Sequence, residues 1–124
     1  MFMITTEFKG HKLSNSNMAL AFYYPEITKG GDMQEDVSKM VEVLKDENDN
    51  PILDKDGNEE KIVKISYPTL LKAYVAFRWA GDREAKNSKS VADIMDEVNV
   101  HDKDEASLFL DVMTKLLSEK SKKD

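Results

Sequence analysis

The spacing of apolar residues changes along this chain, and the changes predict where its helices and strands lie. Residues 2–8 are rich in β-branched and aromatic side chains, and they predict a short β-hairpin that turns near Gly10. The apolar run 18–24 follows several helix-capping candidates at 15–17 and predicts a helix. We expect this helix to be short, because Pro25 disfavours its continuation.

The middle of the chain combines a helical pattern with an acidic, turn-rich segment. Asp32 has Glu35 three residues on, which is the spacing of a capping box. Apolar residues then recur at helical spacing and predict a helix from Asp32 to Asp46 (Met33, Val37, Met40, Val41 and Leu44). Residues 46–61 carry seven acidic side chains around the strong turn signal Asp56-Gly57. The sequence therefore predicts an inserted acidic β-hairpin at 46–65.

The second half of the chain, from Ile65 to Lys120, predicts three amphipathic helices in a row. The first has Pro68 in its opening turn and Gly81 just beyond its end. Ser90 caps the second, which runs to Val98, and Asp102 caps the third. The third carries a clean apolar stripe (Ala106, Phe109, Leu110, Met113, Leu116 and Leu117). Residues 119–124 form a basic tail, for which we expect a frayed, solvated helix end.

These elements predict a single α+β domain over residues 1–124, mostly helical, with an N-terminal β-hairpin and an inserted one. The pattern contains no internal repeat and no linker. The absence of cysteine excludes disulfides and thiolate metal sites, and it favours a cytoplasmic protein. The first residues do not resemble a signal peptide, and the apolar runs are too short to span a bilayer. A net charge of −6 argues against binding to nucleic acid.

The residues that carry chemistry are few and scattered. His11 and His101 lie far apart in sequence, and neither has a partner that would make it a general base. Asp54 to Asn58 superficially resembles part of a calcium-binding EF-hand loop, but its glycine comes too early. We therefore expect no catalytic residue, no cofactor, no metal ion and no enzymatic activity.

Aromatic and apolar residues near helix ends are the candidates for binding a partner protein. Tyr, Trp and Arg are the usual anchors of protein interfaces, although rings at helix ends also often close a core. The candidates are Tyr23, Tyr24, Phe77, Trp79, Leu108 and Val112.

The order of elements resembles the tail assembly chaperones of long-tailed phages that infect Gram-positive bacteria. The matching segments are Ala73 to Gly81, a capped short helix from Ser90 to Val98, and a final helical stripe from Leu108 to Leu117. The resemblance implies a non-enzymatic factor in the host cytoplasm that is absent from the mature virion. It also implies that the protein coats the tape-measure protein and recruits tail-tube subunits.

Two further expectations concern partners. The wide apolar face from Tyr67 to Trp79 predicts that the chain associates with itself. An alternative function is that of an acidic phage-encoded inhibitor that mimics nucleic acid. Such mimics gather carboxylates on one face, whereas lysines interleave with the acids in this sequence.

Overall fold

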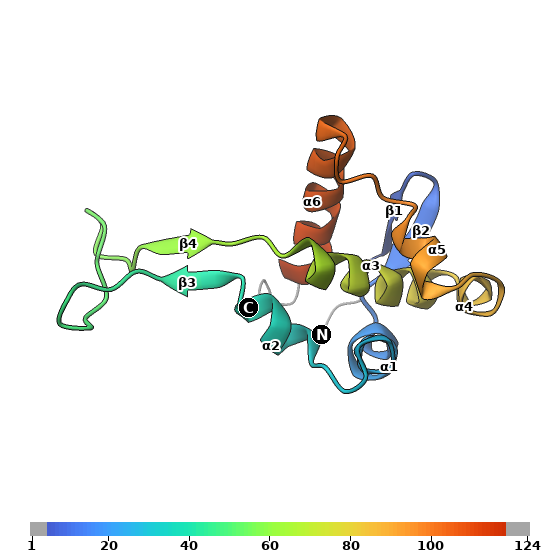
Figure 1. Ribbon diagram of the computed structural model, residues 1–124, viewed down its shortest axis with the longest axis horizontal. Helices are drawn as coiled ribbons and strands as arrows, with labels where there is room; N and C mark the ends of the chain where they lie inside the picture. The colour runs from blue at the N-terminus through green and yellow to red at the C-terminus, as the bar shows by residue number, and fades with distance from the viewer. Residues whose placement is uncertain (1–4, 119–124) are drawn as a thin grey trace.

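The computed structural model describes residues 5–118 and shows an α+β fold, as the sequence predicts. A helical body carries the N-terminal hairpin, and a second hairpin projects from this body as a long arm (Figure 1). The predicted basic tail at 119–124, and the strand residues predicted before Thr5, lie outside the described range.

The N-terminal hairpin forms where the sequence predicts it. Strands β1 (Thr5–Phe8) and β2 (His11–Ser14) pair antiparallel, with Phe8 opposite His11. Lys9 and Gly10 between them have φ of 53° and 82°. A two-residue turn with two positive φ angles matches the right-handed twist of the strands, which explains the Lys-Gly sequence.

The helix after this hairpin continues through Pro25, so the expectation that it stops there is wrong. A π-helical segment, η1 (Ala19–Tyr23), runs directly into α1 (Tyr24–Thr28). The Tyr24 N–H donates to the Ala19 carbonyl, five residues back. In an α-helix a proline ring clashes with the carbonyl four residues before it, and the wider π turn relieves this crowding.

The predicted helix from Asp32 to Asp46 is also wrong beyond its first turns. Asp32 caps α2 (Met33–Ser38) by accepting the Glu35 N–H at 3.1 Å, as the sequence predicts. The chain then enters strand β3 (Val41–Val43), which pairs antiparallel with β4 (Lys61–Val63). Apolar residues at 41 and 43 fit a strand as well as a helix, and pairing with a segment 20 residues away favours the strand.

The arm, residues 41–63, is longer than the predicted hairpin and contains an internal repeat that the sequence pattern did not reveal. In the loop 46–50, Asp46 Oδ1 accepts two backbone N–H groups, two and four residues on. In the loop 54–58, Asp54 Oδ1 does the same. The repeat is eight residues long, and each loop has its positive φ at the same place, Asp49 and Gly57.

The same eight-residue period organises the backbone between the two loops. The Leu44 N–H donates to the Glu60 carbonyl, the Ile52 N–H to the Leu44 carbonyl, and the Glu60 N–H to the Ile52 carbonyl. These three bonds form a closed ring of three chain segments. These bonds connect the three segments at the end of the arm, where the side chains of Ile52 and Leu53 stay exposed.

The body is built around one central helix, α3 (Tyr67–Gly81), with Pro68 in its first turn. Within the described residues, three further helices follow: α4 (Arg83–Ser88), α5 (Val91–Met95) and α6 (Lys103–Ser118). The caps predicted at Ser90 and Asp102 are present. Helix α4 was not predicted, although Asp82 caps it by accepting the Glu84 N–H at 3.1 Å.

The sequence predicted that Gly81 lies just beyond the end of this helix, but Gly81 is the last residue of α3. A Cβ at this position would collide with the Lys12 carbonyl and would lie 2.9 Å from the Leu13 Cα. Gly81 therefore allows β2 to lie directly against the end of the central helix.

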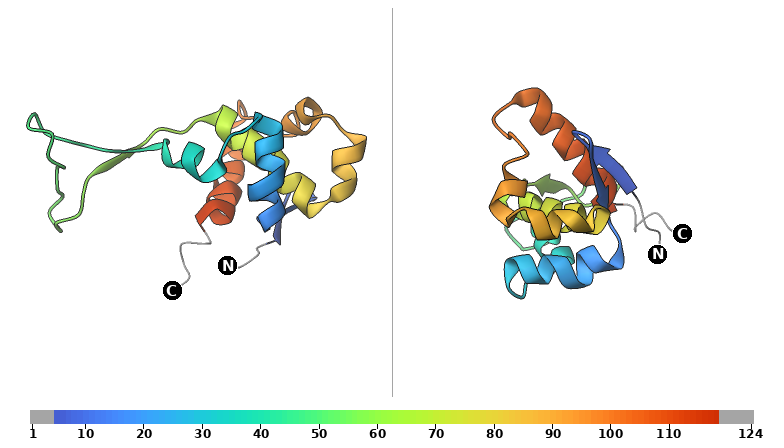
Figure 2. Two further views of the ribbon diagram at one scale, coloured as in Figure 1. Left: turned by 90° about the horizontal axis from the view of Figure 1, so that it is seen from below. Right: turned by 90° about the vertical axis from the view of Figure 1, so that its right-hand side faces the viewer.

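The core forms on all sides of α3, with the first helical segment on one side and α6 with the N-terminal hairpin on the other (Figure 2). Phe8, Tyr74 and Phe109 meet edge to face, with ring centroids 5.7–5.8 Å apart. These three rings join β1, α3 and α6. Tyr74 and Phe77 are fully buried, which explains why α3 is apolar around most of its circumference.

Candidate functional site

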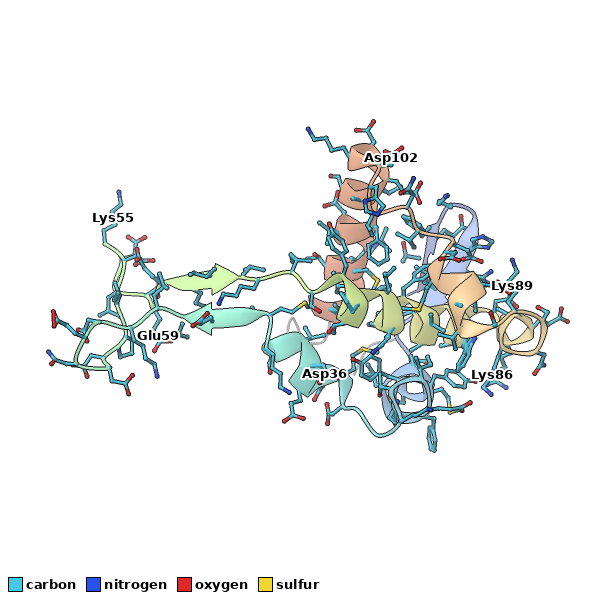
Figure 3. The ribbon with its side chains drawn as sticks, in the orientation of Figure 1. Asp36, Lys55, Glu59, Lys86, Lys89 and Asp102 are labelled. Carbon is cyan, nitrogen blue, oxygen red and sulfur yellow. The ribbon has the colours of Figure 1, made fainter. Side chains whose placement is uncertain are left out.

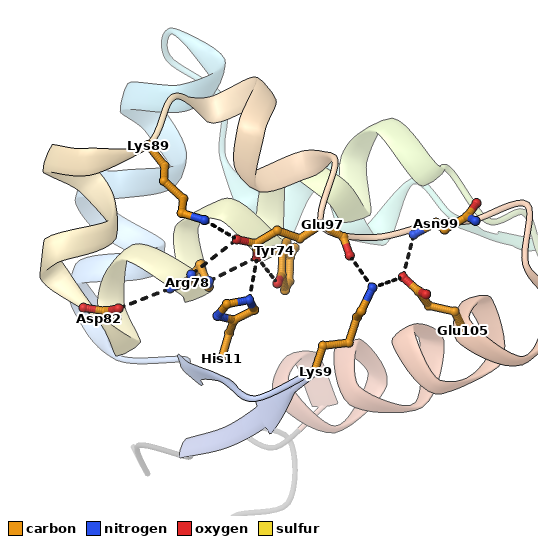
Figure 4. A network of polar contacts seen from close by, with 9 residues as sticks. All are labelled: Lys9, His11, Tyr74, Arg78, Asp82, Lys89, Glu97, Asn99 and Glu105. Carbon is orange, nitrogen blue, oxygen red and sulfur yellow. Dashed lines mark hydrogen bonds and ion pairs between the residues drawn. The ribbon is translucent and has the colours of Figure 1, made fainter.

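A cluster of charged side chains surrounds Glu97, in the segment that links α5 to α6 (Figure 4). Arg78 donates to both carboxylate oxygens of Glu97, at 3.2 and 3.3 Å. The Tyr74 hydroxyl donates to Oε1 at 2.7 Å, and His11 Nε2 lies 3.7 Å from the same oxygen. Lys89 Nζ lies 3.6 Å from Oε2. The carboxylate thus joins β2, α3 and the residue just beyond α4.

The surroundings of Glu97 fix its charge. Burial alone would raise the pKa of this carboxyl, but hydrogen bonds from Arg78 and Tyr74 and the positive charge of Arg78 outweigh it, and the pKa lies below its usual range. Burial, together with the bond to Glu97, raises the pKa of Tyr74. Glu97 is therefore a stable carboxylate with both oxygens occupied by partners, which suits a structural link better than an acid or base in catalysis.

A second set of contacts extends the network to α6. Lys9 donates to the Glu97 carbonyl at 3.1 Å and to Glu105 Oε2 at 3.0 Å. The Asn99 N–H donates to the same Glu105 oxygen at 2.7 Å, and these bonds hold the pKa of Glu105 below its usual range. The turn of the N-terminal hairpin is thereby tied to the start of α6.

Metal-binding groups do not gather in the part of the chain that the structure describes. No group of three or more His, Asp or Glu side chains between residues 5 and 118 has a geometry that could hold a metal ion. In the loop 54–58, which superficially resembles a calcium site, Asp54 Oδ1 accepts two N–H groups of its own loop. His11 contacts Glu97, and His101 is exposed.

Five of the six residues predicted to bind a partner belong to the core, which corrects the expectation that they are accessible. The exposed fractions are 8% for Tyr23, 1% for Tyr24, 0% for Phe77, 5% for Trp79 and 9% for Val112. The remaining candidate, Leu108, is 50% exposed.

These aromatic residues are buried because η1 and α1 pack along α3, so that rings from the first helical segment and rings from α3 cover one another. The Tyr23 ring meets Trp79 edge to face at 5.6 Å, and Lys86 Nζ lies 5.0 Å from the centre of the indole. The Tyr24 hydroxyl donates to Asp36 at 2.7 Å. These aromatic residues close the core. The apolar face from Tyr67 to Trp79, on which the expectation of self-association was based, is therefore largely buried within the chain itself.

An apolar groove that sequence reasoning missed lies where the arm meets the body. It has a volume of about 320 Å³, and nine of its ten lining residues are apolar. The lining comes from α2, the base of the arm, the start of α3 and the last turns of α6 (Val37, Met40, Val41, Val63, Ile65, Leu70, Leu110, Met113, Thr114 and Leu117). Segments this far apart in sequence leave no local signal, so the groove could not be found from spacing.

One face of the arm extends the groove outward. Residues that pair directly across two antiparallel strands project to the same face, as do alternate residues along each strand. Val41 pairs with Val63 and Val43 pairs with Lys61, so these four residues share one face, and Ile65 lines the groove beside Val41 and Val63. We call Val41, Val43, Val63 and Ile65 the apolar strip, and Lys61 borders it at its outer end. Val41 is 43% exposed, Val63 60% and Ile65 44%. The groove and the strip together form the candidate functional site.

The far end of the arm, residues 46–60, differs from the strip in charge. This tip contains seven of the 24 acidic residues and one of the 18 basic residues. Its formal charge is therefore −6, and the rest of the chain, with 17 acidic and 17 basic residues, is neutral. Figure 3 shows Lys55 and Glu59 at this tip, well away from the body. The whole net charge of the chain is carried by a small projecting element.

None of the helices within residues 5–118 has the length and apolar character that crossing a membrane requires. Comparisons of the chain with protein-family models, with curated proteins and with solved structures find no significant match.

Proposed function

We propose that this protein is a non-enzymatic assembly chaperone that holds an apolar helix of a partner protein in the groove between its arm and its body. The observation that carries the proposal is the apolar lining of that groove, which continues onto the exposed strip of the arm. Binding of an amphipathic helix by an apolar groove is a common mode of protein recognition.

The resemblance of the sequence to phage tail assembly chaperones suggests that the partner is a phage tape-measure protein. A tape-measure protein is a long helical protein with apolar stripes that would aggregate if they stayed uncovered. The groove would cover part of such a stripe in the host cytoplasm until tail-tube subunits arrive. On this proposal the chaperone leaves before the virion is complete.

The experiment is co-expression with a candidate tape-measure protein, measuring the fraction of that protein that stays soluble. The test variant combines Val63→Ser and Ile65→Ser, which remove apolar surface from the site at exposed positions. The matched control combines Phe22→Ser and Leu108→Ser, because Phe22 is 61% exposed and Leu108 50% exposed, and neither lines the groove.

We expect the test variant to lose most of the soluble partner and the control to keep it. Capture by the wild-type protein should survive high salt, because apolar contacts are not screened by ions. Loss of capture in the Phe22/Leu108 control alone would place the binding surface elsewhere on the body and would contradict the proposal.

The acidic tip supports a second candidate function, an inhibitor that mimics nucleic acid. A charge of −6 within residues 46–60 is the kind of concentration that a basic nucleic-acid-binding surface would recognise. The same experiment separates the two functions, since a mimic should release its partner at high salt and should tolerate the Val63/Ile65 changes.

A further inference from the structure

The candidate site has two ends with different chemistry. Its inner end is the apolar groove against α6, and its outer end is the acidic tip of the arm. The apolar strip lies between them, and the chain from Val41 to Lys45, the last residue before the tip, covers about 13 Å at the usual rise of a strand. A ligand that fills the groove and lies along the strip therefore reaches the tip.

The tip makes a second copy of this chain a poor occupant. Another copy would bring its own tip, also with a charge of −6, while the rest of its surface has no net charge to attract the first. Like charges in close contact oppose association. The occupant favoured by charge complementarity is a different protein that carries positive charge.

Local ion pairs leave most of the tip unneutralised. Lys45 lies 3.7 Å from Asp49 and is half exposed, and Lys64 pairs with Glu42 at 2.6 Å at the base of the arm. Lys55 is the one basic residue between 46 and 60. The carboxylates of Glu47, Asp56, Glu59 and Glu60 are exposed, and no salt bridge involves them in the described structure.

We infer that the partner is an amphipathic helix whose positive charge is concentrated at one end. Its apolar stripe fills the groove and lies along the strip, and a cluster of lysine or arginine residues at that end lies against the tip. This inference rests on the proposed function and adds to it the partner's charge and its direction along the arm. A helix of about 18 residues is about 27 Å long, about twice the length of the chain from Val41 to Lys45.

The test uses two synthetic, fluorescently labelled helices of about 18 residues with the same leucine stripe. One carries four lysines in its last turns and the other carries four glutamates there. Binding to the full-length protein is measured by fluorescence anisotropy at low and at high salt. We expect the lysine helix to bind at least tenfold more tightly at low salt, and the two affinities to converge at high salt.

A tip variant isolates the contribution of the arm. It combines Glu47→Gln, Asp49→Asn, Asp56→Asn, Glu59→Gln and Glu60→Gln, and it keeps Asp46 and Asp54 because their side chains hold the two loops. The matched control removes five exposed acids from the body: Glu7→Gln, Glu84→Gln, Asp93→Asn, Asp96→Asn and Asp104→Asn. The tip variant should lose the preference for the lysine helix, and the body variant should retain most of it.

The outcomes separate this inference from the proposed function. If both helices bind equally to the wild type, and Val63→Ser with Ile65→Ser weakens both, the groove binds helices but the inferred charge polarity is wrong. Equal loss of preference in the tip and body variants would reduce the effect to overall charge and would also overturn the inference. If neither helix binds, the inference and the proposed function both fail.

Discussion

The body and the arm of this protein use their residues in opposite ways. The body buries aromatic rings around α3 and ties its edges together through Glu97, so that even Arg78 is only 3% exposed. The arm buries almost nothing, and it leaves Ile52, Leu53, Ile62 and Val63 between 37% and 60% exposed. The difference indicates that the body determines stability, whereas the arm and the groove at its base are available for binding.

The largest expected effect is in the aromatic core of the body. Phe109→Ala should lower the free energy of unfolding by about 3–5 kcal/mol, because it opens a cavity between Phe8 and Tyr74. Leu108→Ala, one position away and half exposed, should change it by less than about 1 kcal/mol. Urea unfolding of both variants measures the difference, and similar losses would contradict the described packing of α6.

The next effect concerns the polar network. Glu97→Gln should lower the free energy of unfolding by about 2–3 kcal/mol at neutral pH, because Arg78 and Tyr74 lose their charged acceptor. The pKa of Glu97 is lowered in the folded protein, so its contribution is complete above the unfolded pKa of about 4.3 and is lost as the pH falls through the folded pKa. Wild type and variant should therefore converge in acid, and a constant difference from pH 7 to pH 2 would contradict this role.

Removing the tip of the arm should lower the free energy of unfolding far less than the changes in the body. Replacing Glu47 to Glu60 with a short Gly/Ser loop should lower the free energy of unfolding by no more than about 1–2 kcal/mol, since its large apolar side chains, Ile52 and Leu53, are 37% and 57% exposed. Thermal unfolding followed by circular dichroism checks the result. Loss of a single cooperative transition would show that the arm belongs to the core and that the division between the two regions is wrong.

The smallest expected effect is that of calcium. The loop carboxylates of Asp46 and Asp54 are bonded to backbone N–H groups, and added calcium should leave the melting temperature unchanged beyond general ionic effects. A saturable rise of several degrees at sub-millimolar calcium, absent in an Asp54→Asn variant, would show a metal site in the arm.

Structural features that depend on residues close together in the chain were predicted correctly from the sequence. The caps at Asp32, Ser90 and Asp102 and the turn at Gly57 depend on neighbouring backbone groups, and all of them are present. The N-terminal hairpin is equally local, because its turn residues Lys9 and Gly10 adopt the positive φ that a two-residue turn requires.

Features that depend on distant segments were missed. Val41 and Val43 were assigned to a helix because their partners, residues 61–63, are remote in sequence. Trp79 was expected to be accessible because nothing near it in sequence shows that Tyr23 covers it. The candidate site could not be predicted for the same reason, since three stretches that are far apart in sequence line it (37–41, 63–70 and 110–117).

Amide hydrogen exchange, with and without the bound lysine helix, compares the two regions most directly. In the free protein the arm amides of Leu44, Ile52 and Glu60, which are hydrogen-bonded but lie outside the core, should exchange faster than those of α3. Bound helix should slow exchange in the arm and in the last turns of α6, and leave the exposed surface around Phe22 and the start of α6 unchanged. Protection around Phe22 or Leu108 instead, with the arm unaffected, would contradict the assignment of binding to the arm and its groove.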